Sequence, residues 1–295
     1  MNEMPRMPMD RRARPEYVRE GALGRDFGVV EKPLTLAERL YNNAFLRKSA
    51  LLVLLAVAWE AYARHLNNDL LVPTFTSTID AWVQAIASGE LPGKALNSVR
   101  LLLQGYTLGL VLALILTAFA MLTRIGNDLL ETMTSMFNPL PAIALLPLAL
   151  IWFGLGDKSI IFVLVHSVLW AVALNTHSGF RSVSNTLRMV GRNYGLSGLG
   201  FVMRILIPAA FPSILTGLKI GWAFAWRTLI AAELVFGASS GKGGLGWFIY
   251  ESKNQLDIPS VFAGLFTVIM IGLLVEGLIF RNIEGATVRK WGMQS

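Results

Sequence analysis

Six predominantly apolar stretches, each close to 20 residues long, constrain the fold of this 295-residue chain more than any other feature. They cover residues 49–66, 99–122, 132–153, 159–176, 214–236 and 261–280. A stretch of this length can cross a bilayer as an α-helix, because a helix satisfies its own backbone hydrogen bonds in lipid. The composition agrees, with 54% hydrophobic residues, 15% charged residues and a mean hydropathy of +0.54. We therefore predict an all-α membrane protein with six transmembrane helices in a lipid bilayer.

Arginine and lysine residues predict the orientation of these helices, because positively charged loops resist translocation. With an even number of spans, both ends of the chain lie on the same side. The N-terminal tail, the turn at Arg124 and the end that contains Arg281, Arg289 and Lys290 are then all cytoplasmic. We predict that both termini are cytoplasmic. The net charge of +7 reflects this topology and gives no reason to expect a nucleic-acid partner.

The beginning of the chain differs from the rest. It is charged and rich in proline, and it lacks the short apolar core of a secretory signal. We predict that residues 1–45 form a cytoplasmic tail, with a candidate amphipathic helix at residues 35–45 that Thr35 can cap. Residues 46–295 then form the transmembrane domain.

Residues that could carry covalent chemistry are scarce. The absence of cysteine excludes disulfides, thiol catalysis and zinc-thiolate sites. The three histidines stand far apart, without metal-ligand spacing. We interpret His166 as a buried or helix-contacting residue, and a transport role as the less favoured alternative. We predict no catalytic residue and no metal site.

Two charged residues lie inside the fifth apolar stretch. Arg227 is thirteen residues past its start, or about 20 Å into the membrane at about 1.5 Å per residue. Burying a charge at this depth costs roughly 2.5–3.5 kcal/mol on insertion scales. We therefore hypothesise that Arg227 and Glu233 belong to a solute pathway, where Arg227 attracts a small anion. The alternative is a salt bridge from Arg227 to another span, with Glu60 or Glu276 as the acid.

Prolines interrupt the third apolar stretch at Pro139, Pro141 and Pro147. Each proline removes an amide donor and crowds the preceding turn, so this stretch cannot run as an unbroken helix. Transporters commonly place broken helices beside a substrate site. We therefore predict that Pro139 and Pro141 lie on the solute pathway, and a merely kinked structural helix is the alternative.

Between the fourth and fifth apolar stretches lies a polar loop, predicted at residues 177–212. The segment at residues 175–212 contains four arginines and no acidic residue. Gly195 can act as a hinge and Pro208 as a stop. This pattern predicts a docking surface on the cytoplasmic side of the membrane.

The spacing within this loop resembles the coupling loop of permease subunits of bacterial ABC importers. That motif reads Glu-Ala-Ala, three residues, Gly, nine residues, Ile, any residue, Leu-Pro. Gly195, Ile205 and Pro208 match in position, and Ile207 replaces the leucine. Residues 189–191 depart from the motif, because Met-Val-Gly stands where Glu-Ala-Ala is expected, so Arg188 or Arg192 could supply a different polar contact. The resemblance assigns the contact with an ATPase to Arg188, Met189, Val190, Gly191, Arg192, Tyr194, Gly195, Leu196 and Ser197.

Further segments are similar to the nitrate, sulfonate, taurine and bicarbonate branch of this family. They are residues 71–73, 145–148, 152–154, 174–176 and 231–234. The resemblance implies the type I ABC importer permease (MetI-like) fold in a bacterial inner membrane. It also implies a second permease copy in a homodimer, two cytoplasmic ABC ATPase subunits that hold ATP and Mg, and an extracytoplasmic solute-binding protein. The solute would be a small anion such as a sulfonate, taurine, nitrate, bicarbonate or an organic carboxylate, and this chain would bind no cofactor.

Two other classes of protein are considered. A secondary transporter of small anions would need no ATPase, but it usually shows internal repeats and coupling-ion sites, and no clear repeat relates the two halves of this chain. An intramembrane enzyme would need paired carboxylates or a histidine cluster at helical spacing, which the sequence lacks.

Overall fold

The computed structural model describes residues 42–236 and 243–290. Two compact units divide the chain, residues 1–55 and residues 56–295. The first unit contributes the beginning of helix α2 (Ala44–Leu66), and the second unit contains all the other described elements. Most of the predicted tail, including residues 35–41 of its candidate helix, lies outside the described residues.

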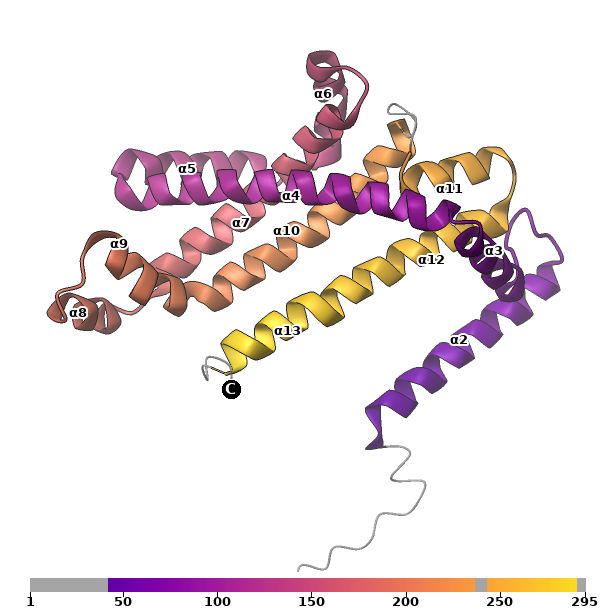
Figure 1. The fold of residues 1–295 in the computed structure, drawn as a ribbon, viewed down its shortest axis with the longest axis horizontal. Coiled ribbons are helices and arrows are strands. Elements are labelled where there is room, and N and C mark those ends of the chain that lie inside the picture. Colours follow the sequence, from indigo (N-terminus) through magenta and orange to yellow (C-terminus); the bar gives the residue numbers. More distant parts are fainter. Residues whose placement is uncertain (1–41, 237–242, 291–295) are drawn as a thin grey trace, which may run out of the picture. The chain divides into compact units, whose positions relative to one another are not determined.

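The regular structure in the described residues is helical throughout, which confirms the predicted all-α fold. Figure 1 shows the helices of the second unit in chain order. They are α3 (Phe75–Ala87), α4 (Glu90–Leu122), α5 (Arg124–Phe137), α6 (Leu146–Phe153), α7 (Asp157–Ser182), α8 (Asn185–Asn193), α9 (Gly198–Phe201), α10 (Ile207–Phe236), α11 (Leu245–Asn254), α12 (Ile258–Leu274) and α13 (Arg281–Glu284). A 3-10 turn (Ala142–Leu145) precedes α6. π-Helical turns precede α10 (Val202–Leu206) and flank α13 (Val275–Phe280 and Gly285–Arg289).

Four helices in the described residues are long and apolar enough to cross a membrane, and they match four of the predicted stretches. They are Glu90–Leu122, Asp157–Ser182, Val202–Val235 and Ile258–Arg289. The third predicted stretch falls on the bent pair Arg124–Phe137 and Ala142–Phe153, which counts as a fifth span if the pair crosses together. Helix α2 covers the first predicted stretch but is not among these spans. The count of six spans and the cytoplasmic termini therefore stay predictions.

Helix α7 is the central helix of the second unit, because α4 and α10 both pack closely against it. Glycines allow this approach. A Cβ atom added to Gly105 of α4 would lie 2.5 Å from the Cβ of Leu164, and one added to Gly217 of α10 would lie 2.8 Å from the Cβ of Asn175. Gly217 and Gly221 form a small face on α10, and the partner of this face is α7 of the same chain.

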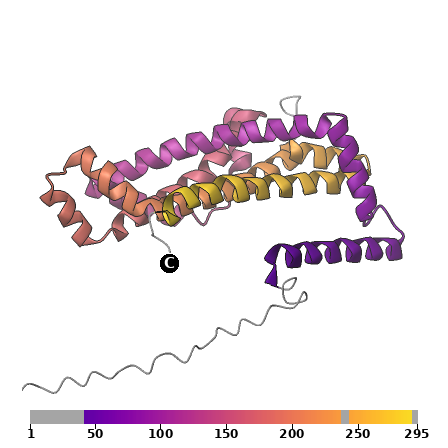
Figure 2. The same ribbon diagram turned by 60° about the horizontal axis from the view of Figure 1, so that its bottom comes forward.

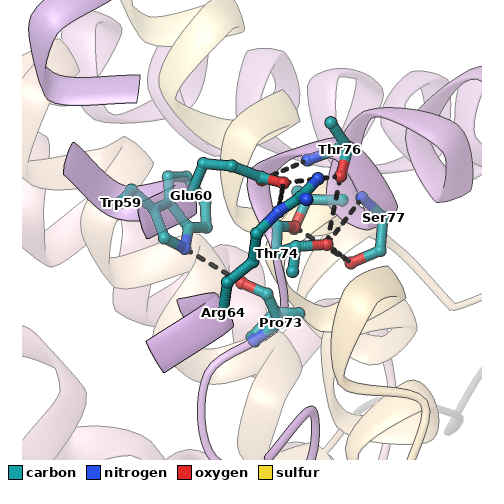
Figure 3. A network of polar contacts seen from close by, with 8 residues as sticks. Trp59, Glu60, Arg64, Pro73, Thr74, Thr76 and Ser77 are labelled. Atoms are coloured by element: carbon teal, nitrogen blue, oxygen red, sulfur yellow. Dashed lines mark hydrogen bonds and ion pairs between the residues drawn. The ribbon is translucent and has the colours of Figure 1, made fainter. Parts of the chain in front are cut away.

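A polar network joins the end of α2 to the start of α3 (Figure 3). Arg64 and Glu60 form an ion pair one helical turn apart, with Arg64 Nε 2.7 Å from Glu60 Oε1. Glu60 Oε2 also accepts a hydrogen bond from the backbone N–H of Thr76 at 3.1 Å. Thr74 caps α3 by accepting from the backbone N–H of Ser77 at 3.1 Å. Helix α3 was not predicted from the sequence, although Thr74 after Pro73 is a local signal for its start.

We predict that Gly105→Ala lowers the stability of the protein by about 1–3 kcal/mol, because the new methyl group must displace Leu164 or separate the two helices. The matched control is Gly93→Ala in the same helix, where an added Cβ has no neighbour within 4 Å. Thermal unfolding of the purified protein in detergent measures both. Equal midpoints for the two variants would contradict this account of the helix packing.

Candidate functional site

A cavity of about 350 Å³ lies where the proline break meets α7 and α10. One face of α10 contributes Phe224, Arg227, Thr228 and Ala231, which recur at helical spacing. The break contributes Phe137, Asn138, Pro139, Leu140, Pro141, Ala142 and Ile143, and α7 contributes His166, Ser167 and Trp170. The structure therefore brings together three of the four predicted pathway residues, namely Arg227, Pro139 and Pro141.

The break itself has a defined backbone. Helix α5 ends at Phe137, and a turn follows in which Leu140 N–H donates to Phe137 O at 3.2 Å. The next helical segment, Ala142–Phe153, is bent by 91° from α5. Pro139 and Pro141 stand within this turn. Pro147 does not interrupt a helix, contrary to the prediction. It stands in the first turn of α6, where an amide has no partner within the helix to lose.

Arg227 lies on the exposed side of α10. In the described part of the chain it makes no ion pair or hydrogen bond. The alternative salt bridges are not formed, because Glu60 pairs with Arg64, and Glu276 has no ion-pair partner among the described residues. The guanidinium is therefore an unneutralised positive charge at the cavity.

Glu233 does not line this cavity. Its side chain is buried, with 3% of the residue exposed. It accepts hydrogen bonds from the Ser98 hydroxyl at 2.8 Å and from the backbone N–H of Gly246 at 2.9 Å. Ser98 in turn accepts from the backbone N–H of Leu245 at 2.8 Å. In this structure, Glu233 therefore holds α4, α10 and the start of α11 together.

Glycines next to Glu233 permit this junction. A Cβ atom on Gly244 or Gly246 would collide with the Glu233 side chain. A glycine-rich segment follows α10, and helix α11 after it was not predicted from the sequence. The first residues of that segment, 237–242, lie outside the described residues. The run of glycines up to Gly246 was the one local signal of a close approach.

Helix α8 carries most of the residues predicted to contact an ATPase. Ser184 caps its start by accepting from the backbone N–H of Leu187 at 3.3 Å. At its end Gly195 is left-handed, with φ at 73°, and Leu196 N–H donates to Gly191 O at 3.1 Å while Gly195 N–H donates to Arg192 O at 2.9 Å. This pair of bonds is a Schellman motif, which explains why a glycine follows α8 at this position.

The two sides of α8 differ. Gly191 is buried, and a Cβ atom there would lie 2.9 Å from the Phe201 ring and 3.0 Å from Ile205. Arg188 turns back and donates to the carbonyl oxygens of Phe180 at 2.6 Å and Val183 at 3.2 Å, so it caps the end of α7. The exposed side carries Met189, Val190, Arg192 and Tyr194, and Tyr194 is 82% exposed.

Helices α7 and α10 both line the cavity, and α8 lies in the connection between these two helices. Helices α8 and α9 lie together at one end of α7 and α10, and α3 and α11 lie toward the other end (Figure 2). Residues 177–182 of the predicted loop continue α7, and residues 207–212 begin α10. The connection between these two helices is therefore short and largely helical.

We predict that Glu233→Gln lowers the stability of the protein by about 1–3 kcal/mol, because an amide nitrogen then faces one of the two buried donors. Glu276→Gln serves as the control, since Glu276 is exposed. Thermal unfolding in detergent compares the two variants. An unchanged midpoint for Glu233→Gln would show that the junction does not stabilise the fold.

Comparison with known proteins identifies the family. Residues 105–283 match the model of the binding-protein-dependent transport system inner membrane component. A putative ABC transporter permease of Methanocaldococcus jannaschii is 29% identical over 245 residues, which is 82% of this chain and 91% of the relative. A putative aliphatic sulfonates transport permease of Escherichia coli is 31% identical over 207 residues, 70% of this chain and 77% of the relative.

A nitrate import permease of Synechocystis is also similar, with 26% identity over 247 residues, 81% of this chain and 88% of the relative. The family match runs from within α4 through α8 to the last long helix, so it includes both the cavity lining and α8. The chain therefore belongs to the binding-protein-dependent transport system inner membrane components, as a multi-pass ABC permease of the nitrate, sulfonate and taurine branch.

Proposed function

We propose that this ABC permease conducts a small anionic solute through a pathway that includes the cavity at Arg227. The unpaired guanidinium in the cavity is the observation that carries the proposal. An unneutralised cation in an otherwise uncharged lining attracts an anion, and its attraction is stronger than in bulk water. Relatives named for aliphatic sulfonates, taurine and nitrate support this solute class. Family membership favours an ATP-driven importer over a secondary transporter.

The exposed side of α8 is our proposed contact with a cytoplasmic ATPase. Met189, Val190 and Tyr194 present an apolar surface, and Met189 occupies the position of the glutamate in the family motif. Arg188 is already engaged by the end of α7, so Arg192 is the arginine left for a polar contact with the partner. The interface is therefore expected to depend mainly on apolar packing, with one cation at its side.

A continuous helix links the contacts of α8 to the cavity. Gly191 of α8 packs against Phe201 and Ile205, and the helix that contains Ile205 continues through Arg227. The distance along this helix from Val202 to Arg227 is on the order of 35 Å at about 1.5 Å per residue. A displacement of α8 by the ATPase would therefore move the cavity lining as part of a rigid body.

The remaining partners are proposed by the same family relationship. The ATPase subunits would hold ATP and Mg and carry the enzymatic activity, while this chain would bind no cofactor. A second permease copy would complete the pathway, as a homodimer. A solute-binding protein would deliver the anion on the extracytoplasmic side, and the N- and C-termini would face the cytoplasm.

We predict that Arg227→Leu abolishes solute uptake while expression and assembly with the ATPase remain normal. Arg227→Lys, which keeps the charge, should retain part of the activity. Uptake and solute-stimulated ATP hydrolysis of the assembled importer are measured across a panel of organic and inorganic anions. Arg281→Gln controls for the loss of an exposed arginine outside the cavity. Normal uptake by Arg227→Leu would exclude a role for this side chain in the pathway.

We predict that Met189→Pro uncouples transport from ATP hydrolysis, because proline removes a backbone donor in the middle of α8 and distorts the docking surface. Met189→Ala keeps the helix and is the control. The ratio of solute transported to ATP hydrolysed in proteoliposomes is the measurement. An unchanged ratio for Met189→Pro would argue against the assignment of α8 as the coupling element.

A further inference from the structure

The cavity at the proline break contains aromatic rings that the attraction of an anion to Arg227 does not require. The Phe137 ring stacks on the Trp170 ring, with centroids 5.3 Å apart and planes at 13°. The His166 ring stands at a steep angle to both, at 84° to Phe137 and 71° to Trp170. Phe224 and Ile143 add further apolar surface to the lining. One wall of the cavity is therefore built mainly of rings.

Polar nitrogen atoms in this wall have no partner. Both ring nitrogens of His166 and the Nε1 atom of Trp170 are buried, and they form no hydrogen bond within the described part of the chain. All three atoms are closed off from the cavity, so a ligand there does not contact them. The wall therefore offers a ligand apolar ring surface rather than hydrogen-bonding nitrogen atoms.

The charge of the lining narrows the chemical class of the ligand further. Arg227 is the one formally charged residue among those that line the cavity, and no carboxylate is among them. Taurine is a zwitterion. Its ammonium group would lose water in this cavity without a carboxylate to pair with, which costs free energy. A small inorganic anion such as nitrate would leave the ring wall uncovered. A cavity of about 350 Å³ is instead within the size range of small-molecule sites.

We propose that the cavity recognises an organic monoanion with an apolar body the size of an aromatic ring. Its acidic group lies at Arg227, and its body packs against Phe137 and Trp170. This inference rests on the proposed function, because it names the class of anion that the same site binds.

The experiment compares anions that share a head group and differ in body. The purified complex of the permease with its ATPase is tested for equilibrium binding of radiolabelled benzenesulfonate, methanesulfonate and taurine, at one pH and ionic strength. We expect benzenesulfonate to bind with a Kd roughly tenfold lower than that of methanesulfonate, and taurine to bind weakest. Equal Kd values for the three probes, or binding of none, would overturn the proposal.

Variants connect this preference to the ring wall. Phe137→Leu should weaken benzenesulfonate binding several-fold more than methanesulfonate binding. Trp170→Leu removes the other ring of the stacked pair and should reduce the preference in the same way, so it tests the wall if Phe137→Leu fails to fold. Trp152→Leu is the control, because Trp152 is an exposed tryptophan outside the cavity lining. A preference unaltered by Phe137→Leu in a folded complex would overturn the assignment.

The variant at Arg227 separates the two levels of the proposal. If Arg227→Gln weakens binding of both sulfonates and the native complex shows no preference between them, the anion pathway stands and the aromatic class is wrong. If Arg227→Gln binds both sulfonates as the native complex does, the pathway assignment itself fails.

Discussion

Close packing of α7 against α4 and α10 is the constraint on which the rest of the structure depends. Gly105 and Gly109 admit the Leu164 and Val168 side chains of α7, and Gly217 and Gly221 bring α10 against its other side. In a bilayer such packing replaces the hydrophobic effect as the main force between helices. The packing also positions the cavity. The glycines contact Leu164, Val168 and Val172 of α7, and the residues between them on the same helix, His166, Ser167 and Trp170, line the cavity.

The same packing connects the cavity to α8. Helix α10 carries Arg227 at the cavity, and the helical segment that precedes it holds Gly191 of α8 through Phe201 and Ile205. The Ser167 hydroxyl donates to Thr228 Oγ1 at 3.0 Å across the α7–α10 contact, next to Arg227. A displacement of α8 would therefore reach the proposed solute site through packed helices and the Ser167–Thr228 hydrogen bond.

Local signals allowed much of this architecture to be predicted from the sequence. Apolar length predicted the long helices, and Pro139 and Pro141 predicted the break. Tertiary contacts explain what was missed. Glu233 was grouped with Arg227 because both are charged residues in one helix, but its partners Ser98 and Gly246 come from distant elements. The capping role of Arg188 and the helix α11 likewise depend on contacts that spacing alone does not show.

Cysteine accessibility tests the central claim, that the cavity beside Arg227 is a water-filled anion pathway. The chain has no native cysteine, so Thr228→Cys gives a single reporter in the cavity lining, and Ile115→Cys gives a control on an exposed apolar side of α4. The account predicts that an anionic, water-soluble thiol reagent labels Thr228→Cys faster than its cationic counterpart, and that ATP changes the rate. Thr228→Cys as unreactive as Ile115→Cys in every nucleotide state would contradict it.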